Sequence, residues 1–227
     1  LMLPLRDNVP TRHFPVVTVA LIAANALVWI WELTGTPWEQ DVFDYGYYVC
    51  SFSGPCTADA GSPLSWPLSL FTSMFMHAGW EHIVGNMLFL WIFGDNVEDA
   101  MGHLRYVAFY LLAGIIAAFT QAFTDVESLT PAIGASGAIA GVMAAYVVLF
   151  PRATVDVIFG VIFIPIPVPA FVLVGLWFVM QVFNGAAALG PDAVGAGGGI
   201  AYFAHMGGFI AGAATVGFFM WGRPRPR

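Results

Sequence analysis

The sequence Gly134-Ala135-Ser136-Gly137 leads directly into an apolar run from Ala138 to Phe150. Glycines allow close backbone approach and turns that other residues resist. A helix that began here would offer free N–H donors and the positive end of its dipole to a developing oxyanion. The spacing of Gly137 and Gly141 is equally typical of packed membrane helices. This stretch by itself therefore leaves two interpretations open, helix packing and catalysis.

The composition is that of a membrane protein. Of the 227 residues, 59% are hydrophobic and 9% are charged, whereas soluble domains carry about 25% charged residues. Several apolar runs approach the roughly 20 residues that are needed to cross a bilayer. We therefore predict a single membrane domain over residues 1–227, with the lipid bilayer as its surroundings. The net charge of −7 says little about partners, because the distribution of charge matters more than its sum.

Six apolar segments account for the predicted membrane region. The expected spans are about 15–33, 82–101, 103–123, 136–150, 170–189 and 200–221. The predicted fold class is an all-α polytopic membrane protein, a compact bundle of six transmembrane helices with a short, recessed fourth helix. Residues 34–81 form a long outer loop in this scheme. Residues 154–169 are rich in β-branched residues and proline, which favours an extended or interfacial segment over a helix.

The positive-inside rule counts lysines and arginines. Because the chain has no lysine, its seven arginines alone show whether this topology agrees with the rule. They are Arg6, Arg12, Arg105, Arg152, Arg223, Arg225 and Arg227. With six spans, every arginine falls on one side of the membrane, and the positive-inside rule makes that side cytoplasmic. Residues 1–14 and the basic tail 222–227 are therefore predicted to be cytoplasmic. The opposite connections carry acidic residues and no basic ones.

The depth of Ser136 follows from the length of the fourth span. Fifteen residues rise about 22 Å, less than the roughly 30 Å hydrocarbon core. If Phe150 lies at the cytoplasmic interface, Ser136 lies below the outer surface. Polar backbone at that depth requires protein or a water-filled cavity around it. The sequence therefore predicts a recessed, wet pocket that opens outward.

Two further sets of polar side chains are expected at a depth in the membrane comparable to that of Ser136. His82 and Asn86 are four residues apart and share one helical face. His205 lies about one turn into the sixth span, and Gly208 and Gly212 lie on its face. Small residues there would let this helix approach the fourth span at its own glycines, which would bring His205 to Ser136. Each histidine alone is more often a packing residue than a catalyst, but ionisable groups within spans are candidate functional residues.

Two other patterns leave alternatives open. Cys50 and Cys56 lie in the predicted outer loop, where they would form a local disulfide in an oxidising compartment or remain free thiols. The run His77-x-x-x-Glu81-His82 suggests a metal site, but its spacing does not match the zinc-protease motifs of this type. We expect no metal and no cofactor.

Taken together, these motifs resemble the rhomboid family of intramembrane serine proteases. The resemblance rests on Gly134-x-Ser136-Gly137, on His205 with Gly208 and Gly212 after it, and on His77-x4-His82-x3-Asn86. It extends from the second span to the sixth, and Glu98 and Gly102 match the family pattern at the end of the second span. Two features depart from the family. The Trp-Arg of the first loop is Trp66-Pro67 here, and the tyrosine four residues after the serine is Ala140.

The resemblance implies a mechanism, a substrate class and a location. Ser136 would be the nucleophile and His205 its general base, in a dyad without an acidic third member. The His82 and Asn86 side chains and the Ser136 backbone N–H would form the oxyanion hole. The substrates would be single-span membrane proteins cleaved near the outer end of their helix. We expect a bacterial inner membrane and no nucleic-acid ligand, and the sequence leaves the oligomeric state open.

The sequence leaves two alternatives. The first is a catalytically inactive, rhomboid-like protein that binds membrane proteins or serves their quality control. The intact pair of Ser136 and His205 argues against it, because an inactive relative would usually have lost one of them. The second alternative is a small-solute transporter or channel. The chain lacks the paired, glycine- or proline-broken segments with charges at mid-membrane depth that transporters carry.

Overall fold

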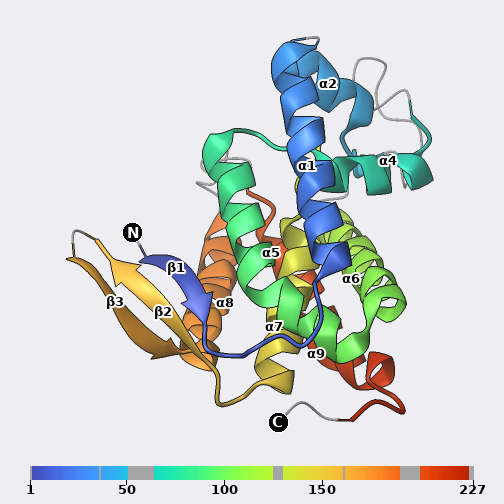
Figure 1. The fold of residues 1–227 in the computed structure, drawn as a ribbon. Helices are drawn as coiled ribbons and strands as arrows, with labels where there is room; N and C mark the ends of the chain where they lie inside the picture. Colours follow the sequence, from blue (N-terminus) through green and yellow to red (C-terminus); the bar gives the residue numbers. More distant parts are fainter. Residues whose placement is uncertain are drawn as a thin grey trace.

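The computed structural model describes residues 2–35, 37–50, 64–124, 130–160, 162–189 and 200–224. Its body is a bundle of apolar helices (Figure 1). They are α1 (Val16–Thr34), α5 (Trp80–Met101), α6 (His103–Thr124), α7 (Ser136–Leu149), α8 (Ala170–Ala188) and α9 (Tyr202–Phe219). The predicted six-helix bundle is confirmed, and every helix begins and ends within two residues of its predicted span.

The helices differ in how well they suit a bilayer. Within the described part of the chain, four helices, α1, α6, α8 and α9, are both long and apolar enough to cross a membrane. Helix α5 has 22 residues, with acidic side chains near both of its ends. Helix α7 is apolar but has only 14 residues, about 21 Å of rise. The predicted short fourth helix is therefore confirmed.

Helix α7 forms the centre of the bundle. It packs against α5, α6 and α9, and its residues from Gly137 to Tyr146 are all buried (Figure 1). A Cβ atom at Gly208 would overlap the carbonyl oxygen of Gly137, and one at Gly212 would overlap that of Gly141. The predicted glycine contact between the fourth and sixth spans is confirmed. It sets α7 and α9 backbone against backbone.

The predicted outer loop contains short helices as well as coil. These are α2 (Trp38–Tyr45), α4 (Trp66–Thr72) and the 3₁₀ turn η1 (Ser73–Phe75). Of the two alternatives left open for Cys50, a disulfide and a free thiol, the structure has the disulfide. Cys56, the possible partner, lies outside the described residues. The glycine-rich turn at residues 195–199 also lies outside them.

A small antiparallel sheet adds to the helical fold. Its strands β1 (Met2–Asp7), β2 (Thr154–Phe159) and β3 (Ile162–Pro169) lie in the order β1-β2-β3, beside α8 (Figure 1). In the register, Met2 is opposite Phe159 and Thr154 is opposite Pro169. The extended segment at 154–169 is confirmed, but the all-α description missed β1. A strand that pairs with a partner about 150 residues away leaves no local signal in the sequence.

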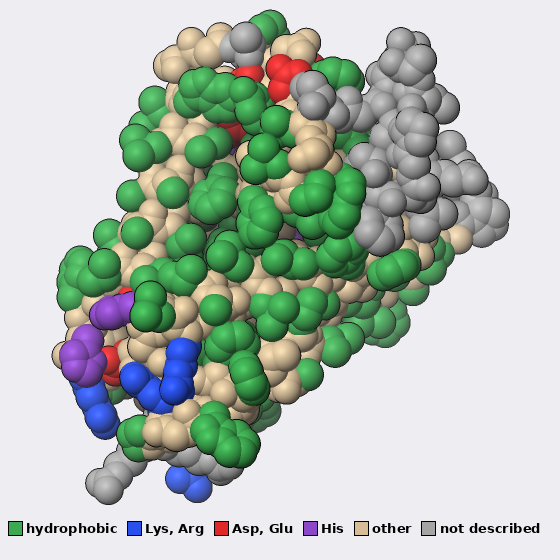
Figure 2. Space-filling model, turned by 90° about the vertical axis from the view of Figure 1, so that its right-hand side faces the viewer, with side chains coloured by type: hydrophobic (Ala, Val, Ile, Leu, Met, Phe, Trp, Pro, Cys, Tyr) green, Lys and Arg blue, Asp and Glu red, His purple; other side chains and the backbone are tan. Residues whose placement is uncertain are grey.

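The two ends of the bundle differ in charge. We call the end where α5 ends and α6 begins the arginine end, since the five described arginines lie in or beside segments that meet there. These are Arg6, Arg12, Arg105, Arg152 and Arg223. The opposite, acidic end carries α2 with its three acidic residues. Figure 2 shows basic side chains gathered at the lower end of one face and acidic side chains near its top.

Candidate active site

Ser136 and His205 form a hydrogen bond near the acidic end of the bundle. Ser136 is the first residue of α7 and His205 lies in the first turn of α9. The Ser136 Oγ and His205 Nε2 atoms are 2.7 Å apart. The glycine contact between the two helices produces this approach, and the predicted placement is confirmed. A hydroxyl bonded to an imidazole is the arrangement in which a serine can be activated as a nucleophile.

The other ring nitrogen of His205 is held by a residue that the sequence analysis did not identify. Gln181 on α8 places its Oε1 atom 2.8 Å from His205 Nδ1, and this side chain is buried. An amide oxygen can only accept a hydrogen bond, so Nδ1 carries the ring proton. The Nε2 lone pair therefore faces the Ser136 hydroxyl.

Helix α8 also places the indole ring of Trp177 beside the His205 imidazole. Trp177 lies one turn before Gln181, with its ring centroid 5.6 Å from that of His205 and an interplanar angle of 39°. With Ala140 in place of a tyrosine, α8 provides the groups that flank His205. The sequence did contain a signal for Gln181, because a polar side chain within an apolar span is a candidate functional residue.

His82 directs a hydrogen-bond donor toward the start of α7. The Ala78 N–H donates to His82 Nδ1 at 3.3 Å, so the proton of a neutral His82 ring lies on Nε2. A Cβ atom at position 134 would lie 2.7 Å from His82 Nε2, and the backbone there has a φ of +114°. Gly134 is therefore required both by its backbone conformation and by the close approach of the His82 ring.

Asn86 places a second donor beside the same glycine. Its side chain is 7% exposed, and its Nδ2 atom has no hydrogen-bond partner among the residues that the structure describes. That atom lies 3.7 Å from a Cβ built at Gly134. The backbone N–H of Ser136, as the first residue of α7, has no carbonyl partner within its own helix. Three donors thus converge at the N-terminus of α7.

A cavity of about 480 Å³ adjoins these groups. Its polar lining consists of the side chains of Ser136, His205, His82, Asn86 and Glu81. Its apolar lining includes Phe89, Met143 and Trp177. A large apolar pocket with a few convergent polar groups is the usual form of a binding site. The arrangement offers a nucleophile, a base and donors for a developing negative charge, which are the groups that acyl transfer needs.

His77 supports the site from behind His82. Its side chain is fully buried, Nδ1–H donates to the Phe75 carbonyl at 3.2 Å, and the ring centroids of His77 and His82 are 5.0 Å apart. Its backbone N–H donates to Glu32 Oε1 at 3.3 Å. Burial lowers the pKa of His77 to about 4, and the neighbouring His82 contributes to the lowering. His77 is therefore neutral at physiological pH.

Trp66 and Glu98, which the sequence also singled out, contact neighbouring helices and do not line the Ser136 cavity. Trp66, at the start of α4, packs its ring against Phe119 of α6 at 6.2 Å between centroids. Glu98 is almost fully buried and binds the start of α1. Within the described residues, no group of three or more His, Cys, Asp or Glu side chains is placed to hold a metal ion.

The fold and this site define a polytopic membrane protein with a serine–histidine pair inside its helical bundle. The family model described as "Rhomboid domain" matches residues 66–222. This match covers more than half of the chain, and the chain belongs to the rhomboid family. The resemblance inferred from the motifs is thereby confirmed.

Curated relatives support the same family. "Presenilin-associated rhomboid-like protein, mitochondrial" of Mus musculus is 32% identical over 146 residues, 63% of this chain and 35% of that protein. "Rhomboid protein 1, mitochondrial" of Saccharomyces cerevisiae is 30% identical over 152 residues, 64% of this chain and 40% of that protein. "RHOMBOID-like protein 12, mitochondrial" of Arabidopsis thaliana is 32% identical over 177 residues, 69% of this chain and 46% of that protein.

The chain therefore spans less than half the length of these relatives. Their names place them in mitochondria, and they lend no support to the expectation of a bacterial inner membrane. The spanning helices make this chain an integral membrane protein, and its compartment stays a prediction.

Proposed function

We propose that this chain is an intramembrane serine endopeptidase that cleaves single-span membrane proteins through Ser136 and His205. The observation that carries the proposal is the 2.7 Å hydrogen bond between Ser136 Oγ and His205 Nε2, beside a cavity of about 480 Å³. Rhomboid family members are generally intramembrane serine proteases. Among the described residues that line this cavity, Ser136 and His205 are the one hydrogen-bonded pair of a hydroxyl and an imidazole.

Acylation begins when the Ser136 oxygen attacks the carbonyl carbon of the scissile peptide bond. His205 Nε2 takes the hydroxyl proton as the new C–O bond forms. The carbonyl oxygen gains negative charge, and His82 Nε2–H, Asn86 Nδ2–H and the Ser136 backbone N–H are the donors that would stabilise it. The C–N bond then breaks, and His205 returns its proton to the leaving amine. The product is an acyl-enzyme ester on Ser136.

Deacylation requires water at the same position. A water molecule gives its proton to His205 Nε2 and attacks the ester carbonyl, which releases the carboxylic acid product and restores the Ser136 hydroxyl. The polar groups that line the cavity beside Ser136 offer hydrogen bonds to a water molecule, and the short α7 would leave Ser136 below the outer surface, where such a cavity opens outward. The site thus combines access to water with a location among transmembrane helices.

Gln181 acts in this proposal as a positioning residue. By accepting the Nδ1–H hydrogen bond it keeps the His205 ring turned toward Ser136 and stabilises the imidazolium that forms during acylation. The role corresponds to that of the acidic member of a serine–histidine–aspartate triad, carried out by a neutral amide. A neutral partner avoids placing an unpaired carboxylate among apolar helices, which is costly in a membrane.

The charge distribution supports an orientation. Basic residues at the arginine end favour the cytoplasmic or equivalent side of the membrane, by the positive-inside rule. The Ser136 cavity then opens toward the opposite side, and the substrate helix is cut near the end that it exposes there. The short α7 supports this location, because Ser136 is its first residue.

The test is cleavage of a model single-span substrate in reconstituted bilayers by wild type, Ser136→Ala and His205→Ala. We expect cleavage by wild type and a loss of at least about 10³-fold in each variant, because neither can form the activated alkoxide. Ser65→Ala serves as the serine control, because Ser65 is exposed and lies before α4. Labelling of Ser136 by a fluorophosphonate probe reports on the nucleophile without a substrate. Cleavage by Ser136→Ala at the wild-type rate contradicts the proposal.

A further inference from the structure

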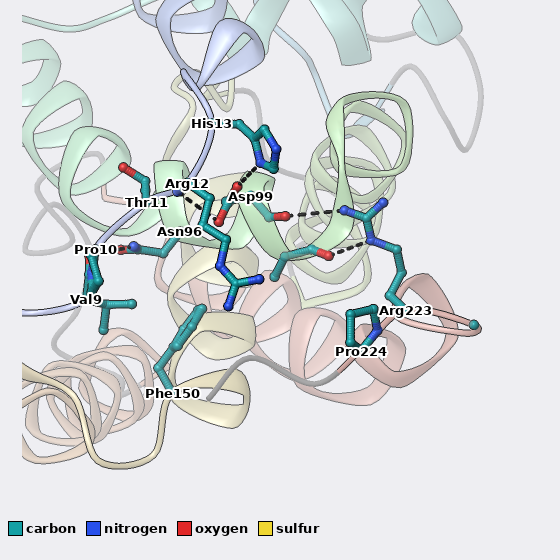
Figure 3. Close-up of a pocket in the computed structure, with 12 residues that line it drawn as sticks. Val9, Pro10, Thr11, Arg12, His13, Asn96, Asp99, Phe150, Arg223 and Pro224 are labelled. Carbon is teal, nitrogen blue, oxygen red and sulfur yellow. Dashed lines mark hydrogen bonds and ion pairs between the residues drawn. The ribbon is translucent and has the colours of Figure 1, made fainter.

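A second cavity lies at the arginine end, far along the bundle from Ser136. Its volume is about 760 Å³. Its walls come from four separate parts of the chain: the segment before α1, the last turns of α5, Phe150 at the end of α7 and the segment after α9. Figure 3 shows Arg12, His13 and Arg223 around it, with Phe150 and Pro224 as apolar wall. No step of the proposed protease chemistry uses these residues.

Arg12 is the free cation of this cavity. Its guanidinium has no hydrogen-bond or ion-pair partner within the described ranges of the chain, although its backbone N–H donates to Asp99 Oδ2 at 3.2 Å. In Figure 3 the Arg12 side chain extends away from the Asp99 carboxylate into the cavity. A guanidinium is a planar group with five donors that match phosphate oxygens, and here these donors face open space.

The nearby carboxylate is already engaged. Asp99 Oδ1 lies 2.6 Å from His13 Nδ1, and Oδ2 accepts the Arg12 backbone N–H. Asp99 thus holds the segment before α1 on the end of α5, and both of its carboxylate oxygens already accept hydrogen bonds. The Arg12 and Arg223 guanidinium groups together leave the cavity with an excess of positive charge.

Arg223 is fixed in place at the other side of the cavity. Its Nε donates to the Ala100 carbonyl at 2.8 Å and its Nη2 to the Asp99 carbonyl at 3.3 Å (Figure 3). Gly102, with a φ of +80°, leaves room for the guanidinium, because a Cβ there would lie 3.0 Å from Arg223 Nη1. A cation held by the backbone in this way loses little further entropy on binding an anion.

Exposed apolar side chains place this cavity at the level of lipid headgroups. Phe14 is 69% exposed before α1, Leu104 is 87% exposed at the start of α6 and Trp221 is 81% exposed after α9. Large apolar and aromatic side chains at helix ends mark the boundary between acyl chains and water. Basic pockets between helices at this boundary are suited to anionic headgroups. A free anion in solution would need no such apolar surroundings.

We propose that the cavity formed by Arg12, His13 and Arg223 binds the phosphate of an anionic phospholipid headgroup. Arg12 supplies the free guanidinium and Arg223 supplies a fixed one, while Phe150 and Pro224 contact the apolar part of the headgroup region. The bound lipid would join the segment before α1 to the segment after α9. This inference does not depend on the proposed activity of Ser136.

The test is lipid binding by the purified protein in non-ionic detergent, read from the rise in Tm as short-chain phosphatidylglycerol is added. Phosphatidylcholine and inorganic phosphate are titrated separately. The variants are Arg12→Gln, which removes the free charge, and Arg12→Lys, which keeps it. Arg152→Gln is the matched control, because Arg152 is an exposed arginine in the turn after α7, outside the cavity.

We expect saturable binding of phosphatidylglycerol to wild type and to Arg152→Gln. Arg12→Gln should weaken it about fivefold, the effect of one basic side chain on an anionic lipid, and Arg12→Lys should restore most of it. Equal binding by Arg12→Gln and wild type overturns the proposal, as does an equal loss in Arg12→Gln and Arg152→Gln. Saturation by inorganic phosphate at the same concentrations shows a free-anion site instead and overturns the lipid assignment.

Discussion

Two buried polar groups near the opposite ends of α5, Glu98 and Asn86, differ in their hydrogen bonding. At the arginine end, Glu98 is 1% exposed and each carboxylate oxygen is bonded. It accepts from the Val17 and Thr18 backbone N–H groups at 2.8 and 2.7 Å and from the Thr18 hydroxyl at 2.7 Å. His103 Nδ1 lies 2.6 Å from it. At the other end, Asn86 Nδ2 and His77 Nε2 are buried without a partner among the described residues.

This difference separates a structural cluster from a candidate reactive one. The Glu98 carboxylate satisfies the free N–H groups at the start of α1, which has no side-chain cap of its own. It therefore joins α1, α5 and α6. A buried donor without a partner costs about 1–3 kcal/mol, and the unpaired Asn86 Nδ2 beside Ser136 is free to bind a ligand or an intermediate. The satisfied Glu98 carboxylate thus joins helices, whereas the unpaired Asn86 donor lines the cavity where chemistry is proposed.

Among these buried polar groups, the largest expected effect comes from removing the unpaired donor of Asn86. Asn86→Ala should lower kcat by about 10²–10³, the usual loss for one oxyanion donor. Its free energy of unfolding should stay the same or rise, because an unsatisfied buried group is removed. Cleavage kinetics and thermal unfolding measure the two effects. Asn184→Ala, a change of an exposed asparagine on α8, should leave both unchanged, and a fall in stability without a fall in kcat would contradict this view of Asn86.

The opposite pattern is expected at the arginine end. Glu98→Ala leaves the donors of Val17 and Thr18 without an acceptor and should lower the free energy of unfolding by about 3 kcal/mol. For a chain of this size, Tm should fall by roughly 10 °C. The protein that remains folded should keep its kcat. Glu39→Ala, at an exposed carboxylate of α2, is the control, and a Tm as high as that of the control would argue against a structural role for Glu98.

Gln181 combines both features, because its side chain has a hydrogen-bond partner and that partner is His205, the proposed general base. Gln181→Leu should lower kcat by about 10- to 100-fold through misorientation of His205, with little change in KM. Gln181→Glu retains an acceptor and should recover activity. Its carboxylate would hold a proton on the imidazole more tightly, so the acid limb of the pH–rate profile should move to higher pH. A profile identical to that of wild type would favour a packing role.

His77 gives the smallest expected effect, a pH dependence of stability. Its pKa is lowered by burial to about 4 in the folded chain, against an ordinary value of 6.5. Between these values the unfolded chain binds a proton that the folded chain does not, so stability falls as the pH drops from 6.5 toward 4. His77→Gln should reduce this slope of Tm against pH. An unchanged slope would show that the acid sensitivity arises at other groups.

The sequence predicted the bundle well because its signals are local. The lengths of the apolar segments indicate the helices, and the arginine distribution indicates their orientation. The glycines of α7 and α9 indicate which faces of these two helices meet. Ser136 and His205 could be paired in advance for the same reason, since one helix contact brings them together. The disagreement was confined to β1, where pairing partners about 150 residues apart carry no periodic signal.

The sequence by itself determined which segments enter the membrane, which helix is too short to cross it, and which polar residues accompany them. Those properties follow from the composition and period of one segment at a time. Only the tertiary structure decided that Gln181 holds His205, that Glu98 caps α1, and that Arg12 faces a cavity without a partner. Each of these depends on the rotation and depth of one helix relative to another, which the packing of the whole bundle sets.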